Sequence, residues 1–449
     1  MTLVKNSLHQ AVVTGYASDG MGIARIDGQV VFVERGVRGD LCTVRIVKAL
    51  KNKAYARIEQ LLEPSAHRQP NDCPAYPRCG GCDFRHMRYE EELFYKRQRV
   101  QDALERLGGF PCPELEIVGG DAAHYRNKAM YPCALQDGRP TAGFYRRRSH
   151  EVVPCAACAI QSAQADALKG AVLDWARENG VAPYEEQSGQ GLLRHIYVRT
   201  GAAGALLTLV ATAHTLPAQA DLVERCRQSC PELVGIVVNC NSERTNRVLG
   251  RENRTLWGEG RLRDSLCGVE FSLSPLSFYQ VNRGQAERLY RQAVEYAAFG
   301  PEDTVLDLYC GTGTITLVMA RACRQAVGVE IVPEAVEDAK KNAAANHIAN
   351  ARFLCADAGQ AARQLAQEGF RPDVVVVDPP RKGLDEAARD AIAELGPRRV
   401  VYVSCAPATM ARDVKELAAR GYTLRQAKAF DLFPRTANVE SVCLLVKAG

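Results

Sequence analysis

The stretch 304-TVLDLYCGTGTIT-316 decides the fold of this chain. Its apolar first half has the pattern of a buried strand, Gly311 and Gly313 mark a tight turn, and a helical pattern follows. Glycine at such a turn lets the backbone approach a ligand closely. The stretch therefore predicts a nucleotide-binding strand–turn–helix unit.

Strand-like and helical patterns alternate after this unit. The strand-like runs lie at residues 326–330, 352–354, 374–378 and 400–404. Such alternation predicts a parallel, doubly wound sheet. The last two strand patterns, at 423–433 and 440–447, have no helix between them and predict a pair of antiparallel strands at one edge of the sheet. We therefore expect an α/β, Rossmann-like domain over residues 271–449.

Acidic residues stand at the ends of successive predicted strands. Glu330 suits ribose hydroxyls, Asp357 suits an adenine end, and Asp378 opens an Asp-Pro-Pro turn. A dinucleotide fingerprint would have a third glycine where Thr316 stands, so S-adenosylmethionine is favoured over NAD. Arg381 follows the two prolines, where amino-group methyltransferases usually have an aromatic residue. The sequence thus predicts a methyltransferase that does not act on an amino group.

A cysteine and a glutamate at two further strand ends point to covalent catalysis. Cys405 follows the strand at 400–404 and is a candidate nucleophile at the same crevice. Carbon 5 of a pyrimidine is a poor nucleophile, but a thiolate that adds at C6 creates an enolate able to attack a methylsulfonium carbon. Glu440, at the start of the last strand, offers a carboxylate to remove the C5 proton.

Cysteine spacing indicates a metal site in the first third of the chain. Of 17 cysteines, most are isolated in apolar surroundings and are interpreted as core residues. Cys73, Cys79 and Cys82 lie within ten residues of one another. Zinc or a [4Fe-4S] cluster fits this spacing, and Cys155 or Cys158 is expected to supply the fourth thiolate.

Two smaller regions precede the catalytic domain. Residues 1–62 contain short strands separated by glycines, which predicts an OB-like β-barrel that resembles a TRAM domain. Lys and Arg outnumber Asp and Glu there, which favours an acidic partner such as RNA. Residues 63–270 hold the clustered cysteines, a helical pattern over 89–107 and alternating strands and helices, so we expect a metal-binding, α+β middle domain.

On these motifs the chain resembles the RNA 5-methyluridine methyltransferases, and most of all their 23S ribosomal RNA branch (RumA/RlmD type). The resemblance spans nearly the whole length. It implies a TRAM barrel, a middle region with a [4Fe-4S] cluster, S-adenosylmethionine as methyl donor and 23S rRNA as partner. It also implies that the helix at 89–107 packs on the catalytic domain. The target uridine is expected to be flipped out of its stack.

The resemblance also implies roles for individual residues. The segment 277-SFYQVN-282 resembles the family's F-x-Q-V-N element, which places Phe278 near the target base. Cys405 matches the nucleophile and Glu440 the base. The implied [4Fe-4S] ligands are Cys73, Cys79, Cys82 and Cys158, with Cys155 as a rival for the fourth. The cofactor-binding residues implied are Gln280, Tyr309, Gly311, Gly313, Thr314, Glu330, Asp357 and Asp378.

Composition excludes several classes of protein. Hydrophobic residues make up 47% and charged residues 24%, which is typical of a globular protein and not of a disordered one. Apolar runs are too short for a membrane span, and residues 1–10 lack a signal-peptide pattern, so we expect a cytoplasmic protein. A monomer is taken as the default. Two alternatives remain: a tRNA 5-methyluridine methyltransferase, and an RNA-binding protein with a degenerate methyltransferase domain.

Overall fold

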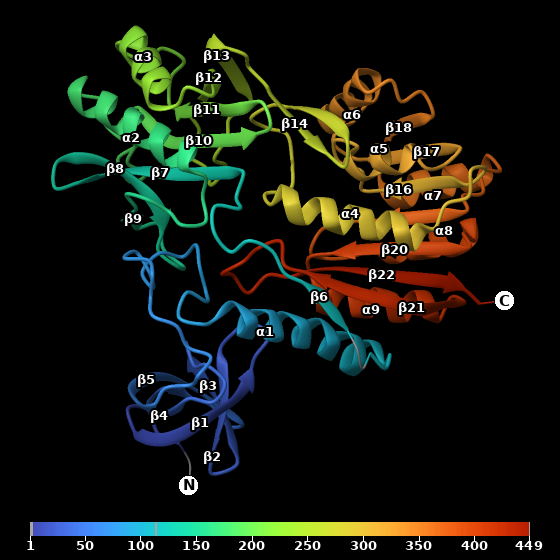
Figure 1. Ribbon diagram of the computed structural model, residues 1–449, viewed down its shortest axis with the longest axis horizontal. Coiled ribbons are helices and arrows are strands. Elements are labelled where there is room, and N and C mark those ends of the chain that lie inside the picture. The colour runs from blue at the N-terminus through green and yellow to red at the C-terminus, as the bar shows by residue number, and fades with distance from the viewer. Residues whose placement is uncertain (1–2, 113–114, 449) are drawn as a thin grey trace.

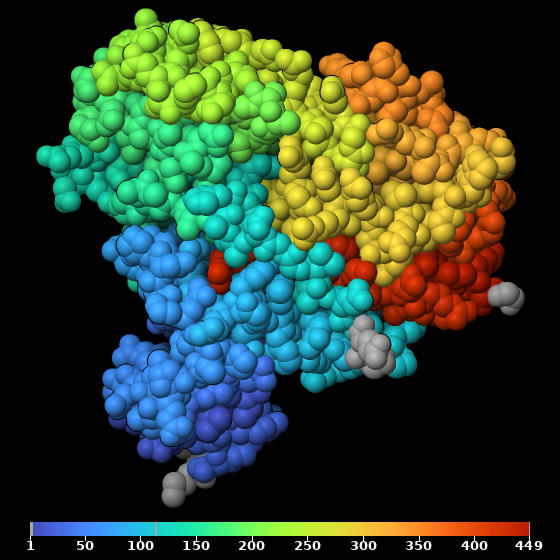
Figure 2. All heavy atoms as spheres, viewed as in Figure 1, coloured from blue at the N-terminus to red at the C-terminus, as the bar shows by residue number. Residues whose placement is uncertain are grey.

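The computed structural model describes residues 3–112 and 115–448. Met1, Thr2 and Gly449, at the outer limits of the expected first and third domains, lie outside these residues, as do residues 113–114. Figure 1 shows a small barrel, a middle sheet with helices on one side, and a larger sheet flanked by helices on both faces. Figure 2 shows the barrel as a separate lobe at the lower left.

The N-terminal strands close into a barrel in the order β1-β2-β3-β5-β4. Alternate side chains of these strands point inward, and the interior is filled by small and branched residues such as Val31, Val44 and Ala54. The predicted OB-like barrel is confirmed. Its strands are β1 (Leu8–Tyr16), β2 (Gly22–Ile26), β3 (Gln29–Glu34), β4 (Leu41–Ala49) and β5 (Lys53–Glu63).

A long helix joins the barrel to the catalytic sheet. Helix α1 (Tyr89–Asp102) continues into a π-helical turn, η1 (Ala103–Gly108), and ends at Gly109 in a left-handed conformation. Val100 and Leu104 are fully buried in the core that the catalytic strands also form. Figure 1 shows α1 running between the barrel and the catalytic sheet.

The middle region forms a mixed sheet in the order β13-β12-β11-β10-β7-β8-β9. Its core packs around Trp175 of α2, which is fully buried. The strands are β7 (Lys128–Gln136), β8 (Arg139–Tyr145), β9 (Val152–Pro154), β10 (Leu193–Gly201), β11 (Gly204–Ala211), β12 (Leu233–Cys240) and β13 (Glu252–Gly258), and the helices are α2 (Ala163–Glu178) and α3 (Gln219–Ser229).

A hairpin follows, made of β14 (Leu262–Leu266) and β15 (Val269–Leu273). The expected domain boundary after residue 270 falls inside β15. Val269 and Phe271 are buried with residues of α4 and of the catalytic strands. β15 therefore packs in the catalytic core, whereas Leu262 of β14 packs with Leu206 and Val237 of the middle sheet.

The catalytic sheet has the order β18-β17-β16-β19-β20-β22-β21-β6. Strands β16 to β20 are parallel, and β22 is antiparallel to both β20 and β21. The predicted α/β, Rossmann-like fold is confirmed. The strands are β16 (Thr304–Leu308), β17 (Gln325–Glu330), β18 (Ala351–Cys355), β19 (Val374–Val377), β20 (Arg399–Ser404), β21 (Tyr422–Phe430) and β22 (Glu440–Lys447).

Helices cover both faces of this sheet (Figure 1). They are α4 (Arg283–Ala297), α5 (Thr314–Ala320), α6 (Pro333–Ala345), α7 (Ala358–Gln367), α8 (Glu386–Leu395) and α9 (Pro407–Ala418). Strand β6 (Glu116–Val118) was not expected from the sequence. It pairs with β21 at the sheet edge, although more than 300 residues separate the two strands.

Candidate active site

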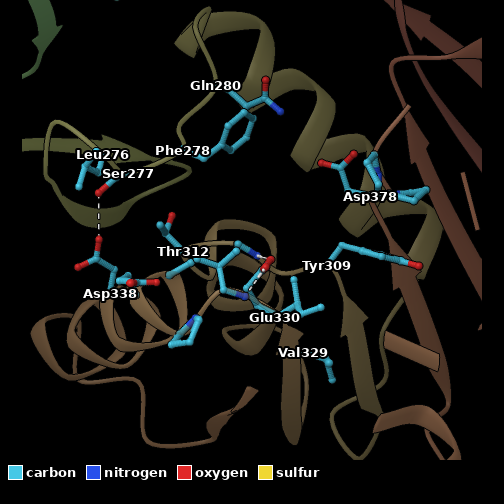
Figure 3. Close-up of a pocket in the computed structure, with 18 of the residues that line it drawn as sticks. Leu276, Ser277, Phe278, Gln280, Tyr309, Thr312, Val329, Glu330, Asp338 and Asp378 are labelled. Carbon is cyan, nitrogen blue, oxygen red and sulfur yellow. Dashed lines mark hydrogen bonds between the residues drawn. The ribbon is translucent and has the colours of Figure 1, made fainter. Parts of the chain in front are cut away.

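A cavity of about 1560 Å³ opens at the carboxyl ends of the parallel strands. This is the edge at which open α/β sheets bind their ligands. Figure 3 shows the part lined by the β16 turn, the end of β17 and the segment after β15. The structure brings nine of the expected site residues to its wall: Phe278, Gln280, Tyr309, Gly311, Glu330, Asp357, Asp378, Cys405 and Glu440.

The turn after β16 has an unusual backbone. Tyr309, Gly311 and Gly313 have φ angles of 74°, 56° and 81°, all in the left-handed region. The N–H groups of Tyr309 and Cys310 both donate to the carbonyl of Val329, at 3.0 and 2.9 Å. An aromatic residue with positive φ is rare and clusters at functional sites. The turn thus stores strain where the cavity begins.

Glu330 is held by the turn it faces. Its Oε2 accepts a hydrogen bond from the Gly311 N–H at 3.0 Å, and its Oε1 accepts one from the Val332 N–H at 2.9 Å. These bonds fix the carboxylate at the cavity wall (Figure 3). A fixed carboxylate beside a glycine turn is suited to binding ribose hydroxyls.

Asp357 has a structural task besides its place in the cavity wall. It is the N-cap of α7, and its Oδ1 accepts hydrogen bonds from the backbone N–H groups of Gly359 and Gln360. The sequence interpretation gave this residue a ligand-binding role alone. The cap explains why an aspartate begins the helix whether or not a ligand is bound.

Gly313 and Thr314 do not line the cavity. A Cβ on Gly313 would lie 3.0 Å from that of Ala339, so this glycine keeps α5 close to α6. The Thr314 and Gln280 side chains both hydrogen-bond to Tyr290, which is buried in α4. The structure therefore places Gly313 and Thr314, two of the expected cofactor-binding residues, behind the cavity wall.

Phe278 and Gln280 are positioned by the middle region. The carbonyl of Gln280 accepts a hydrogen bond from Asn127 Nδ2 at 2.9 Å, and the Ser277 carbonyl accepts one from Arg199. The Phe278 side chain is 65% exposed although it borders the cavity. A large aromatic ring held in solvent at a cavity mouth is available for stacking on a base.

Strand pairing brings Cys405 and Glu440 together. Cys405 directly follows β20, and Glu440 is the first residue of the antiparallel strand β22, whose Ser441 pairs with Ser404. Asp378 follows the neighbouring strand β19 and lines the same cavity. The register thus places a thiol and two carboxyl groups at one end of the sheet.

Burial and mutual repulsion shift the pKa values of these groups. Burial raises the pKa of Glu440 well above its usual value, and the charge of Asp378 adds to the increase. Burial also raises the pKa of Asp378 to about 6. The pKa of the Cys405 thiol is raised by burial first and then by Glu440 and Asp378. Perturbed groups that converge in a cavity are typical of active sites.

The Arg381 side chain opposes these increases in pKa. It affects both Cys405 and Glu440, and its positive charge favours the ionised form of each. It lowers the pKa of each and hydrogen-bonds to Cys405. Its Nη2 also donates to Asn438 Oδ1 at 3.3 Å. The sequence interpretation used Arg381 only to exclude N-methylation. Arg381 lies three residues after Asp378, at the same strand end, and this position in the sequence could have indicated that it belongs to the site.

The clustered cysteines are neighbours, but the described residues are not arranged as a metal site. The Cys79 thiol is close enough to Cys158 and Cys73 for each to raise its pKa, and Cys158 acts on Cys82 in the same way. In residues 3–112 and 115–448, no three His, Cys, Asp or Glu side chains are placed to hold a metal ion. The Cys155 thiol donates a hydrogen bond to the Ala157 carbonyl at 3.1 Å, and the expected cluster is not confirmed.

Comparison with known proteins places this site in a family. Residues 268–448 match the model of the tRNA (Uracil-5-)-methyltransferase family, and residues 10–58 match that of the TRAM domain. An uncharacterized RNA methyltransferase of Clostridium tetani is 39% identical, over 99% of this chain and 97% of the relative. The chain belongs to the RNA 5-methyluridine methyltransferase family. A second RNA methyltransferase, from Halalkalibacterium halodurans, is also 39% identical, over 98% of this chain and 97% of its own length.

A solved structure agrees with this membership. The tRNA (uracil-54, C5)-methyltransferase of Pyrococcus abyssi, in complex with S-adenosyl-L-homocysteine, matches with a TM-score of 0.78 and 26% identity. The match covers 98% of this chain and all of that one. As a 5-methyluridine methyltransferase, this protein uses S-adenosylmethionine to methylate uracil C5 in RNA. Within the described part of the chain, no helix is long and apolar enough to cross a membrane.

Proposed function

We propose that this protein transfers a methyl group to C5 of a uridine in 23S rRNA, with Cys405 as nucleophile and Glu440 as base. One observation carries the proposal: Cys405, Glu440 and Asp378 line the same cavity as the strained turn at Tyr309 and Gly311. That arrangement sets a thiol and a base beside a place for a nucleoside-like methyl donor.

The reaction begins at the Cys405 sulfur. Its raised pKa means that the free protein holds a neutral thiol, so the thiol proton passes to solvent as the sulfur bonds to C6 of the uracil, and the thiolate regains a proton from solvent when it leaves. Arg381 favours the thiolate because its positive charge opposes the effect of the two carboxyl groups. Addition at C6 moves the ring electrons to C5 and O4, which makes C5 nucleophilic.

The second half of the reaction depends on Glu440. S-adenosylmethionine would supply an electrophilic methyl carbon: C5 bonds to this carbon as the sulfonium S–C bond breaks, and S-adenosylhomocysteine is the leaving group. C5 then carries both the methyl group and its original proton. The Glu440 carboxylate accepts this proton, the electron pair reforms the C5–C6 double bond, and the Cys405 thiolate leaves. Burial raises the pKa of Glu440, so Glu440 must be ionised before it acts; its carboxylate is then a stronger base than one in water, which suits this step.

The walls of the cavity divide the remaining tasks. Glu330 and Asp357 are suited to the ribose and adenine ends of the methyl donor, beside the Gly311 turn. Phe278 offers an exposed ring on which a flipped uracil stacks. The N-terminal barrel is suited to holding the RNA backbone, because Lys and Arg exceed Asp and Glu there.

A tRNA uridine is the second candidate substrate. It is favoured by the match to the Pyrococcus abyssi tRNA enzyme, which extends over nearly the whole chain, barrel included. The barrel therefore does not argue against tRNA. Support for rRNA comes from the cysteine-rich stretch 73–82, because a barrel together with such cysteines resembles the ribosomal branch.

Two transcripts distinguish the substrates. Unmodified 23S rRNA and unmodified tRNA are each incubated with the protein and methyl-labelled S-adenosylmethionine, and the labelled nucleoside is mapped by nuclease digestion and mass spectrometry. We expect 5-methyluridine in the rRNA and no label in the tRNA. Label in the tRNA alone would replace the first candidate with the second.

We also propose that Cys73, Cys79, Cys82 and Cys158 bind a [4Fe-4S] cluster. Four thiolates are the usual ligands of such a cluster, and the Gly81 backbone N–H already donates to the Cys79 sulfur at 3.3 Å. Anaerobically purified protein should contain about four irons and four sulfides per chain. The content should fall in Cys158→Ala and persist in Cys155→Ala; the reverse would assign the fourth ligand to Cys155.

A further inference from the structure

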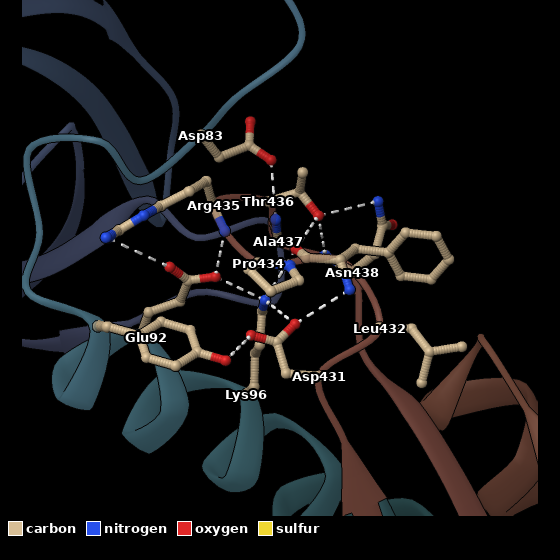
Figure 4. Close-up of polar contacts among 12 residues, drawn as sticks. Asp83, Glu92, Lys96, Asp431, Leu432, Pro434, Arg435, Thr436, Ala437 and Asn438 are labelled. Atoms are coloured by element: carbon tan, nitrogen blue, oxygen red, sulfur yellow. Dashed lines mark hydrogen bonds and ion pairs between the residues drawn. The ribbon is translucent and has the colours of Figure 1, made fainter. Parts of the chain in front are cut away.

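An irregular segment, residues 431–438, leads directly to the proposed base. It joins β21 to β22, which begins at Glu440, and it contributes Phe433 and Asn438 to the cavity wall. Figure 4 shows that the contacts of this segment come from α1 and from the cysteine-rich stretch, which precede it by more than 300 residues. The conformation of the segment therefore depends on distant parts of the chain.

Helix α1 supplies a buried ion group to one end of the segment. Lys96 Nζ donates to Asp431 Oδ1 and Glu92 Oε1, both at 2.6 Å, and to the Phe433 carbonyl at 3.1 Å. The three charged side chains have no solvent exposure. Glu92 Oε1 also accepts the Arg435 N–H at 2.6 Å. These bonds connect two turns of the helix to the backbone of the segment (Figure 4).

The cysteine-rich stretch holds the other end. Asp83, directly after Cys82, accepts the Ala437 N–H on Oδ2 at 2.8 Å, and its own N–H donates to the Arg435 carbonyl at 2.7 Å. Tyr125, ahead of β7, donates to the Pro434 carbonyl at 2.9 Å. Figure 2 shows red atoms of the late chain enclosed between blue and cyan atoms of these earlier regions.

The backbone of the segment is strained as well as held. Arg435 has a φ angle of 72°, a left-handed conformation that costs a non-glycine residue free energy. Such a conformation persists when its surroundings over-determine it. Here, the N–H of Arg435 is held by α1, and its carbonyl by the N–H groups of Asp83 and Phe84. The held geometry fixes where the chain enters β22, and thus where Glu440 lies.

We propose that Asp83 and Lys96 are positioning residues that place Glu440 for removal of the C5 proton. This inference rests on the proposed role of Glu440 as base. Asp83 acts through the backbone of Ala437, three residues before Glu440, and Lys96 acts through Asp431 and Phe433. The proton-removal step is therefore coupled to the cysteine-rich stretch and to α1, neither of which contributes a residue of its own to the cavity wall.

Asp83→Ala tests the proposal because Asp83 is less buried than Lys96. Its side chain is 19% exposed and its ion-pair partner Arg147 is 57% exposed, so its loss leaves no buried charge unpaired. The matched control is Asp72→Ala, which also removes an aspartate next to a cysteine, but one whose carboxylate pairs with Arg85 and not with the segment. Asp83→Asn is the rescue variant, because its amide oxygen still accepts the Ala437 N–H. Lys96→Met tests the helix contact in parallel.

The readout separates positioning from general damage to the fold. Each variant is incubated with labelled S-adenosylmethionine and the RNA transcript that the wild type methylates, then denatured to detect a methyl-labelled protein–RNA adduct. Misplacement of the base alone leaves Cys405 able to add and C5 able to take the methyl group, so the adduct should accumulate. We expect Asp83→Ala to lower kcat by about 10- to 100-fold, with KM for S-adenosylmethionine changed by less than about threefold. Asp83→Asn should restore most of the rate.

The possible outcomes are distinct. Adduct accumulation in Asp83→Ala or Lys96→Met, but not in Asp72→Ala, supports the proposal. A rate equal to the wild type in both test variants overturns it, as does a lower rate without adduct. If the wild type makes no 5-methyluridine in either RNA, the proposed function itself fails, and this inference fails with it.

Discussion

The Glu330 carboxylate accepts a hydrogen bond of 3.0 Å from the Gly311 N–H at the wall of the cavity. The bond ties the end of β17 to the turn after β16, and Glu330 Oε1 is held in turn by the Val332 N–H. A ligand that binds at Glu330 therefore meets an acceptor whose direction is already set, which lowers the entropy lost on binding.

Glu330→Ala should weaken binding of S-adenosylhomocysteine by roughly 10- to 100-fold, because hydrogen bonds to a charged group contribute about 1.5–3 kcal/mol. Isothermal titration calorimetry measures the change. The control is Glu386→Ala, in the first turn of α8 and outside the cavity wall. Unchanged affinity in Glu330→Ala would remove this residue from the ligand site.

Glu440→Gln should separate the two halves of the reaction. The amide keeps the size of the side chain but cannot accept the C5 proton. Cys405 should still add to the uracil and C5 should still be methylated, so a covalent protein–RNA adduct should survive on a denaturing gel. Release of free 5-methyluridine RNA at the wild-type rate would show that another group is the base.

Gly313→Ala tests why a glycine precedes α5. Gly313 and Gly369 have the same φ of 81°, but a Cβ on Gly313 would meet Ala339 and Phe353 at 3.0 and 3.1 Å, whereas one on Gly369 would meet nothing within 4 Å. Gly369→Ala should lower the free energy of unfolding by about 1 kcal/mol from backbone strain. Gly313→Ala should cost about 2–4 kcal/mol, since crowding adds to the strain. Denaturant titration of both variants checks this difference, and equal losses would contradict it.

Asp307→Asn tests the effect of a buried carboxyl in β16. Burial raises the pKa of Asp307 to about 7, although Thr316 Oγ1 donates to its Oδ2. Between pH 4 and pH 7 the unfolded chain releases this proton and the folded chain keeps it, so the wild type loses stability as pH rises. The slope is at most about 1.4 kcal/mol per pH unit.

The variant has no such proton, so its stability relative to the wild type should increase from pH 4 to pH 7 and then level off. Denaturant titrations of both proteins across this range measure the difference. A difference that stays constant with pH would show that the Asp307 pKa is not raised in the folded protein.

Local patterns were enough to predict the strand ends that form the cavity wall. Gly311, Glu330, Asp378 and Cys405 each follow a recognisable strand, and a parallel sheet necessarily brings such ends to one edge. The predicted antiparallel strand β22 then places Glu440 beside the end of β20, which Cys405 follows. The sequence was informative there because strand direction alone decides which residues meet.

Contacts between distant segments could not be predicted in the same way. Nothing local in residues 116–118 indicates that β6 pairs with β21, and nothing in α1 indicates that Lys96 reaches Asp431. The position of Arg381 against Cys405 depends on the course of the loop after Asp378. Likewise, cysteine spacing shows which thiols are near in sequence, but not that the Cys155 thiol donates to the Ala157 carbonyl.

The most direct test of covalent uracil-C5 methylation compares Cys405→Ala with Cys355→Ala, an exposed cysteine at the end of β18. Each protein is incubated with labelled S-adenosylmethionine and the RNA that the wild type methylates, and 5-methyluridine is quantified by mass spectrometry after complete digestion. We predict wild-type yield from Cys355→Ala, and neither 5-methyluridine nor adduct from Cys405→Ala, which should still bind S-adenosylhomocysteine. 5-Methyluridine formed by Cys405→Ala at a rate near that of the wild type would contradict the account.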